Sequence, residues 1–163
     1  MNSALSFTNS PYTSFMHETK IRLSNGIELH VEMGGNPQDP AIMLIMGLGA
    51  QMLFWPDFFC KSLIDQGYRV IRFDNRDIGL SSKIRHSGPR LNTFKLMGRF
   101  ALGLENQGAP YNLYDMAEDA ALLIEHLGLE TVSVLGASMG GMIAQILAAK
   151  YPKKVNTLGL IFT

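Results

Sequence analysis

The residues best suited to chemistry in this sequence form one pentapeptide, Gly136-Ala137-Ser138-Met139-Gly140. A short β-branched run precedes it and a helical pattern follows at once, so Ser138 is predicted to lie on a tight turn between a strand and a helix. Such a turn holds the serine at a positive φ. Gly136 and Gly140 leave the room that this conformation needs. The pattern predicts a nucleophilic serine hydroxyl above the end of a sheet.

The helix predicted to follow Ser138 allows two interpretations of this residue. Its N-terminal dipole and free N–H groups favour negative charge that builds up at the serine during a reaction. Alternatively, Ser138 only caps the helix within a Gly-rich turn, which is a common role for serine. The strand before it and the helix after it are the context that a nucleophile requires, so we favour the first interpretation.

With this motif the sequence resembles the α/β-hydrolase family, from about Thr19 onward. It is most similar to the branch that holds esterases, polyketide methylesterases and aminopeptidase-like enzymes. Three further segments carry the likeness: residues 45–51 (IMGLGAQ), 73–81 (FDNRDIGLS) and 114–128 (YDMAEDAALLIEHLG). The resemblance implies a doubly wound, mostly parallel α/β sheet with an antiparallel N-terminal hairpin. It also implies a small-molecule carboxylic ester or related acyl substrate, hydrolysed without a cofactor or a metal.

The resemblance also implies where the oxyanion of an acyl-transfer reaction is held. In this family the donors are the backbone N–H after the nucleophile and one from the loop after the third strand. These positions match Met139 and Leu48. Many relatives have His-Gly where this chain has Met46-Gly47, a change that keeps the backbone donor and alters the packing behind it.

A group of charged residues follows the fourth predicted strand. Asp74, Arg76 and Asp77 fall on the D-x-R-G-x-G motif of the family, and Asp77 replaces the usual glycine. We interpret these charges as a pairing network that holds the loop, since ion-pair networks are a common alternative to catalysis for such clusters.

Local patterns predict the first elements of the sheet. Alternating runs on either side of Asn25-Gly26 predict a hairpin with a type I′ turn. Residues 42–46 and 69–73 are typical of buried parallel strands. The helix between them has Pro56 in its first turn and ends at Gly67. Its predicted apolar face consists of Trp55, Phe58, Phe59, Ser62 and Leu63.

The second half of the chain continues this alternation. Residues 82–112 are predicted to form a long loop with one short helix near residues 96–104. Asp115 is predicted to cap the next helix, which ends at Gly128. The apolar stripe of that helix consists of Met116, Ala120, Leu123, Ile124 and Leu127. The serine turn and a last strand at residues 155–162 complete the pattern.

Composition sets the broad class of protein. The 163 residues suffice for one domain that buries roughly 70% of the surface of its unfolded chain. Lys and Arg total 14, as do Asp and Glu, so no net charge favours nucleic acid or an anionic membrane. Cys60 is the single cysteine, which excludes an internal disulfide and favours a reducing compartment. We expect it on a buried helix face.

The N-terminus and the apolar runs bear on location. Residues 1–17 are predicted as a flexible N-terminal arm, and residues 18–163 as the N-terminal part of an α/β-hydrolase domain. The start of the chain lacks the pattern of a secretory signal. The longest apolar run, residues 41–46, is far shorter than the ~20 residues of a membrane span. We therefore expect a cytoplasmic protein with neither a membrane nor nucleic acid as partner.

The loop at residues 47–52 raises a competing hypothesis. It follows a strand, opens a helix, and has Asp74 at the end of the next strand, which resembles a dinucleotide-binding fingerprint. The third glycine of that fingerprint is missing, however, and Met52 would crowd the contact that this glycine permits. A dinucleotide-binding domain also has no need of Ser138.

The catalytic machinery implied by the family is incomplete in this sequence. In this fold an acid and a histidine follow the serine, but no Asp, Glu or His follows Ser138. The four histidines, His17, His30, His86 and His126, all precede it, and we interpret each as a structural surface residue.

We therefore expect an α/β-hydrolase fold truncated after the sixth strand. The last strand would then be an unpaired sheet edge, which favours self-association. The alternative function is an inactive hydrolase fragment that acts through association with itself or with a partner.

Overall fold

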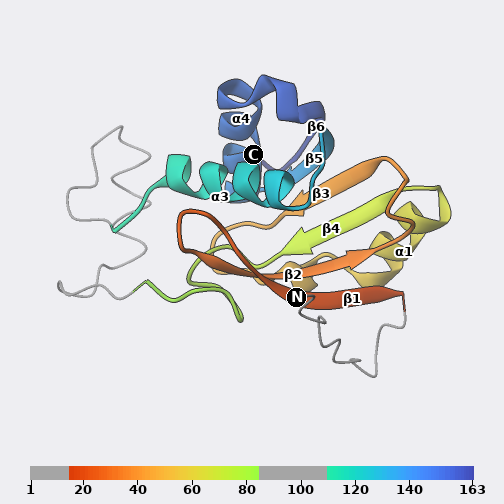
Figure 1. The fold of residues 1–163 in the computed structure, drawn as a ribbon, viewed down its shortest axis with the longest axis horizontal. Coiled ribbons are helices and arrows are strands. Elements are labelled where there is room, and N and C mark those ends of the chain that lie inside the picture. The colour runs from red at the N-terminus through yellow and green to blue at the C-terminus, as the bar shows by residue number, and fades with distance from the viewer. Residues whose placement is uncertain (1–14, 85–109) are drawn as a thin grey trace, which may run out of the picture.

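A computed structural model describes residues 15–84 and 110–163, and its elements follow the predicted alternation (Figure 1). The strands are β1 Met16–Arg22, β2 Glu28–Gly34, β3 Ala41–Ile45, β4 Arg69–Phe73, β5 Val132–Ala137 and β6 Val155–Ile161. The helices are α1 Asp57–Asp65, α3 Leu113–His126 and α4 Met139–Lys150, with short 3₁₀ turns η1 Met52–Phe54 and η2 Pro152–Lys154.

The six strands form one sheet in the order β1-β2-β4-β3-β5-β6. β1 pairs with β2 and β2 with β4 in antiparallel fashion, whereas β3 pairs in parallel with both β4 and β5, and β5 with β6. The predicted fold class, a mostly parallel doubly wound sheet with an antiparallel N-terminal hairpin, is confirmed.

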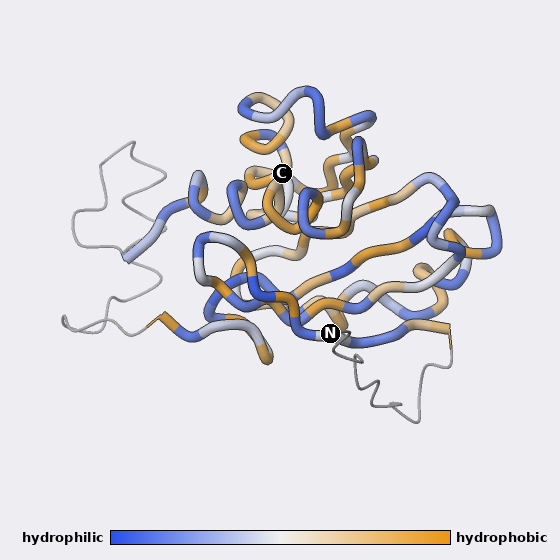
Figure 2. The backbone as a smooth tube through the Cα atoms, viewed as in Figure 1, coloured by the Kyte–Doolittle hydropathy of each residue, from blue (hydrophilic) through white to orange (hydrophobic). Residues whose placement is uncertain are grey.

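Helices cover both faces of the sheet (Figure 1). On one face α3 and α4 pack together over an apolar cluster that includes Met43, Leu123 and Ile143. On the other face α1 covers a smaller cluster that includes Leu44 and Cys60. Alternate residues of the central strands thus enter opposite clusters, and Figure 2 shows hydrophobic residues running along these strands. Cys60 is fully buried.

The β1–β2 hairpin exists, but its turn is not the predicted type I′. That turn needs a positive φ at both central residues, and in Ser24-Asn25-Gly26 only Gly26 has one, at 86°. The Gly26 N–H donates to Leu23 O at 3.0 Å and the Leu23 N–H to Ile27 O at 2.7 Å. The connection is therefore a three-residue loop that ends in a left-handed glycine, because the strands come together one residue earlier than the prediction assumed.

The apolar face predicted for the helix at residues 57–65 was partly wrong. Pro56 caps α1, so Trp55 lies before the helix, and the helical period starts at Asp57. In this register Cys60 is buried, whereas Phe58 is 75% exposed. The prediction placed Trp55 and Phe58 on one helical face, and the extended backbone at Pro56 breaks that period.

The cap of α3 also differs from the prediction, although its buried stripe is confirmed. Asn112, not Asp115, is the N-cap. Its side chain accepts hydrogen bonds from the Tyr114 and Asp115 N–H groups, at 2.7 and 3.3 Å. Asp115 accepts in return from the Asn112 N–H at 2.7 Å. This reciprocal arrangement is a capping box, in which the acidic residue stands three positions after the cap.

Two predictions fall largely outside the described residues. The short helix near residues 96–104 lies there entirely, as do residues 1–14 of the predicted arm. Met16 and His17, also assigned to that arm, lie in β1 opposite Gly34 and Met33. Within residues 15–84 and 110–163, no helix is long and apolar enough to cross a membrane.

Candidate active site

Ser138 occupies the turn between β5 and α4 in an unusual backbone conformation. Its φ is 53° and its ψ is −125°, and its side chain makes no hydrogen bond that caps α4. The Ser138 N–H donates to Ile161 O, and Ser138 O accepts from the Gly141 N–H, both at 2.8 Å. The backbone is thus held on both sides, while the residue is exposed.

The two glycines that flank Ser138 allow this turn to close. A Cβ at Gly136 would lie 2.6 Å from the Cα of Gly141, and a Cβ at Gly140 would lie 2.7 Å from the carbonyl carbon of Ile45. Real Cβ atoms do not approach backbone this closely. A side chain at either position would therefore separate α4 from the strands beneath it.

The loop after β3 lies directly against Ser138. A Cβ built on Gly47 would be 3.1 Å from Ser138 Cβ and 3.2 Å from Ala137 O. The contact follows from topology, because β3 and β5 are parallel neighbours whose carboxyl ends lie at one edge of the sheet. Leu48, the next residue of the loop, is 46% exposed, and Met139 is the first residue of α4.

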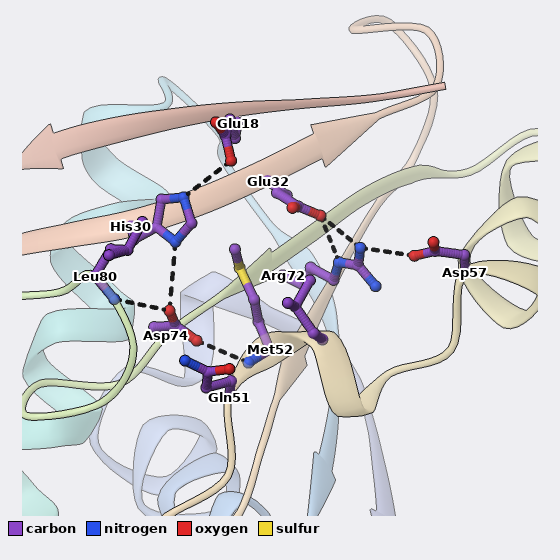
Figure 3. Close-up of a pocket in the computed structure, with 10 residues that line it drawn as sticks. Glu18, His30, Glu32, Gln51, Met52, Asp57, Arg72, Asp74 and Leu80 are labelled. Atoms are coloured by element: carbon purple, nitrogen blue, oxygen red, sulfur yellow. Dashed lines mark hydrogen bonds and ion pairs between the residues drawn. The ribbon is translucent and has the colours of Figure 1, made fainter. Parts of the chain in front are cut away.

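Asp74 holds the far end of this loop (Figure 3). Its Oδ1 accepts the Met52 N–H at 2.8 Å, and its Oδ2 accepts the Leu80 N–H at 3.2 Å and lies 3.3 Å from His30 Nδ1. Burial acts to raise the pKa of Asp74, but the hydrogen bonds from His30, Met52 and Leu80 outweigh it and lower the pKa. Asp74 is therefore an ionised anchor for the loops on either side of it.

Asp77 lies where the family motif has glycine, and its backbone conformation explains why glycine is usual at this position. Its φ is 66°, a conformation that glycine adopts freely and that Asp tolerates better than most residues. Asp77 Oδ1 also accepts the Ile84 N–H at 2.6 Å. The Asp side chain thus stabilises the strained turn that carries it.

Arg76 connects this loop to α3. Its guanidinium donates through Nε and Nη2 to the two carboxylate oxygens of Asp119, both at 2.7 Å, and stacks over the Tyr111 ring at 5.1 Å. Asn25 of the hairpin donates to the same Asp119 at 2.8 Å. The interpretation of these charges as a pairing network agrees with these contacts.

His30 is not the surface residue that the sequence predicted. It is 7% exposed and lies between Asp74 and Glu18, whose Oε2 is 3.4 Å from His30 Nε2. The alternation of β2 correctly places Leu29 and Val31 in the core, so His30 points to the opposite face. That face is covered too, by η1 and the loop after β4, and local sequence carries no sign of this.

A cavity of about 510 Å³ opens beside these residues, on the α1 side of the sheet (Figure 3). It is lined by Glu18, His30, Glu32, Gln51, Met52, Leu53, Asp57, Arg72, Asp74 and Leu80. Arg72 donates to Glu32 and to Asp57, both at 2.8 Å. Ser138 does not line it, so this cavity is separate from the serine turn.

The described histidines do not supply a base to Ser138. His30 is held by the two carboxylates, His17 lies on β1, and His126 lies in the last turn of α3. His86 is outside the described residues. Nor do three His, Cys, Asp or Glu side chains gather as a metal site within residues 15–84 and 110–163.

The structure does not support dinucleotide binding at the residue 47–52 loop. The ribose-binding role would need a free Asp74 carboxylate, but three donors inside the protein occupy it. Met52 is 1% exposed and fills the position of the missing glycine.

Comparison with known families agrees with this architecture. A model of the α/β hydrolase fold family matches residues 40–163, well over half of the chain. The chain therefore belongs to the α/β hydrolase fold family, as the motifs predicted.

Individual curated relatives share sequence with this chain over most of its length. The rhodomycin D methylesterase DnrP of Streptomyces peucetius is 31% identical over 140 residues, which cover 86% of this chain and 40% of that protein. The AB hydrolase superfamily protein YfhM of Bacillus subtilis is 30% identical over 135 residues, covering 83% and 40%. The chain thus spans about 40% of the length of these curated relatives.

Solved structures show the same likeness. A membrane phospholipase A, described as a bacterial virulence factor, has a TM-score of 0.68 at 28% identity and covers 89% of this chain and 39% of its own. Cfl2 of Burkholderia cenocepacia has a TM-score of 0.75 at 20% identity, covering 96% and 45%, which shows the shared fold alone.

Proposed function

We propose that Ser138 is the nucleophile of a serine hydrolase that acts on a carboxylic ester or related acyl compound. The observation that carries this is the positive φ of Ser138 in an exposed strand-to-helix turn with no capping hydrogen bond. A serine that only capped α4 would bond an N–H of the first turn. The likeness to a methylesterase supports an ester as the substrate class.

The proposed chemistry begins with attack of Ser138 Oγ on the substrate carbonyl carbon. The carbonyl oxygen becomes an oxyanion, which the N–H groups of Met139 and Leu48 would stabilise together with the N-terminal dipole of α4. The closeness of Gly47 to Ser138 supports this pairing, since it brings the two backbone segments together. The serine proton must pass to a base, because a neutral hydroxyl is a weak nucleophile.

The buried state of Cys60 is compatible with a reducing compartment, and we include a cytoplasmic location in the proposal.

The test adds imidazole as an external base that can accept the serine proton. The 163-residue chain is incubated with a short-chain nitrophenyl ester and imidazole, and acylation is located by peptide mass spectrometry while nitrophenol release is recorded. We expect acyl label on the peptide that contains Ser138, and none there in Ser138→Ala. Ser62→Ala, which removes an exposed serine of α1, is the matched control and should keep the label. Equal labelling in Ser138→Ala, or none in any variant, would contradict the nucleophile assignment.

A second candidate function, association through β6, is favoured by the apolar surface of that strand. Among the described residues β6 pairs only with β5, and Leu158, Leu160 and Phe162 are 39%, 45% and 95% exposed. An unpaired apolar edge favours pairing with another chain. Light scattering should show a mass that rises with concentration for the wild-type chain and for the control Leu53→Lys, but not for Leu160→Lys. A concentration-independent monomer mass would exclude self-association.

A further inference from the structure

Both ring nitrogens of His30 face a carboxylate. Nδ1 lies 3.3 Å from Asp74 Oδ2, and Nε2 lies 3.4 Å from Glu18 Oε2. A neutral imidazole carries one N–H, so it can donate to only one of these carboxylates, and its second nitrogen would direct a lone pair at the other. The arrangement is fully satisfied only when His30 is an imidazolium with two donors.

The contacts of His30 with Glu18 and Asp74, here called the His30 ion bridge, connect to the loop beside Ser138 through Asp74. Asp74, which receives His30 on Oδ2, receives the Met52 N–H on Oδ1. Met52 begins η1 and ends the segment that starts at Gly47. At the other end of the segment, Asn75 donates from Nδ2 to Met46 O at 3.0 Å. Two consecutive residues after β4 thus hold the two ends of the residue 47–51 loop.

We propose that His30 is a positioning residue, whose protonated ring ties the β1–β2 hairpin to Asp74 and so orders the residue 47–51 loop that carries Leu48. Its consequence for catalysis rests on the proposed function, in which the Leu48 N–H binds the oxyanion. The ordering of the loop itself does not depend on that function.

The other charges near His30 are paired with one another. Glu32, beside His30 on the same face of β2, binds Arg72, which also binds Asp57 of α1. Lys20 lies opposite His30 in the sheet, but its Nζ lies 3.5 Å from Glu28. Glu18 and Asp74 therefore contribute most directly to the charge state of the ring. The Asp74 hydrogen bond raises the pKa of His30, against the opposing effect of burial.

The proposal predicts that the order of the loop depends on pH. Below the pKa of His30 the ring holds both carboxylates. Above it the ring loses one donor, and Asp74 is held less firmly by the hairpin. We expect the loop to become more mobile as pH rises through this pKa, even though Met52 keeps its own bond to Asp74.

Nuclear magnetic resonance of the full 163-residue chain tests this directly. The ring nitrogens of His30 are titrated, and the ¹⁵N order parameters of Leu48 and Gly49 are measured on both sides of the midpoint. We expect a midpoint above the ordinary value of about 6.5, with lower order parameters for both loop amides above it. Order parameters that do not change across the midpoint, or a midpoint at or below 6.5, would overturn the proposal.

Two variants separate His30 from other titrating groups. Glu18→Gln removes one carboxylate and should move the His30 midpoint down, with the change in the Leu48 and Gly49 amides moving by the same amount. His126→Gln removes an exposed histidine on α3 and should leave the loop transition in place. A loop transition that stays at its wild-type pH in Glu18→Gln would overturn the proposal. Because no turnover is measured, failure of Ser138 acylation would leave this result interpretable.

Discussion

At the scale of single residues, Ser138 and Asp77 share one property: each has a positive φ although neither is glycine. Such conformations cost about 1 to 3 kcal/mol each and persist only where the surroundings hold them. Backbone hydrogen bonds from α4 and β6 hold Ser138, and the bond to Ile84 holds Asp77. Strain that survives in an exposed turn is common at functional sites, which is why we give Ser138 a chemical role.

The strain at Ser138 predicts a difference between two substitutions. Ser138→Ala and Ser138→Gly both remove the hydroxyl, but only glycine adopts a positive φ without a steric cost. We expect the glycine variant to be more stable than the alanine variant by about 1 kcal/mol in urea unfolding. An alanine variant as stable as the glycine variant would mean that the turn is not strained.

The His30 ion bridge predicts a pH-dependent stability. The pKa of the His30 imidazole is raised above 6.5 in the folded protein. The bridge therefore stabilises the fold fully below about pH 6.5, and this contribution is lost as pH rises through the folded-state pKa of His30. In urea unfolding, the wild-type chain should therefore lose stability relative to His30→Gln as pH increases above about 6.5. A constant difference between the two proteins across this range would contradict the prediction.

At the scale of elements, the start of α3 is set by its N-cap residue, Asn112, and not by Asp115, the acidic residue of its first turn. Asn112 and Asp115 satisfy each other's N–H groups, and the helix turns its buried stripe toward α4 and the sheet. The start of α3 matters beyond the helix itself, because Arg76 donates to Asp115 O at 3.3 Å. The cap therefore supports the contact between α3 and the loop after β4.

Removal of the cap should lower stability by a measurable amount. We expect Asn112→Ala to reduce the free energy of unfolding by about 1 kcal/mol, the usual loss for a cap side chain. Asn156→Ala, at an exposed position of β6, is the matched control and should change it by less than about 0.5 kcal/mol. Equal effects of the two substitutions in urea titration would show that the Asn112 side chain does not cap α3.

At the scale of the whole molecule, Asp119 joins three segments that are far apart in the sequence. It binds Arg76 after β4 and Asn25 in the hairpin, and it lies on α3 with 2% exposure. Burial acts to lower the pKa of Arg76, but the hydrogen bond and charge of Asp119 outweigh it and raise that pKa, so the Arg76 guanidinium stays charged. Residues of the hairpin, the loop and the helix thus depend on one carboxylate.

Breaking this pair should be costly, because one buried charge would remain without a partner. We expect Asp119→Asn to lower the free energy of unfolding by about 3 to 5 kcal/mol, whereas Arg76→Met combined with Asp119→Leu recovers most of the loss. Urea unfolding of the single and double variants measures both. A double variant as unstable as Asp119→Asn would show that packing, not the unpaired charge, dominates.

The sequence by itself determined the features that depend on neighbours along the chain. The strand at residues 69–73, the helix end at Gly128 and the fold class follow from period, turn residues and the order of elements, and the structure agrees. The role of the glycines around Ser138 could likewise be predicted from the sequence, because a tight turn needs them wherever it occurs. The nucleophile and its oxyanion donors stay a prediction from these motifs.

Only the tertiary structure decided the environments of the polar residues on the other face of the sheet. His30 and Asp74 are separated by 44 positions, and Arg72 and Glu32 by 40. Alternation along β2 tells which residues point away from the core, but not that η1 and the loop after β4 cover that face as well. Burial and ion pairing of this kind arise from contacts between distant segments, so no local pattern of residues encodes them.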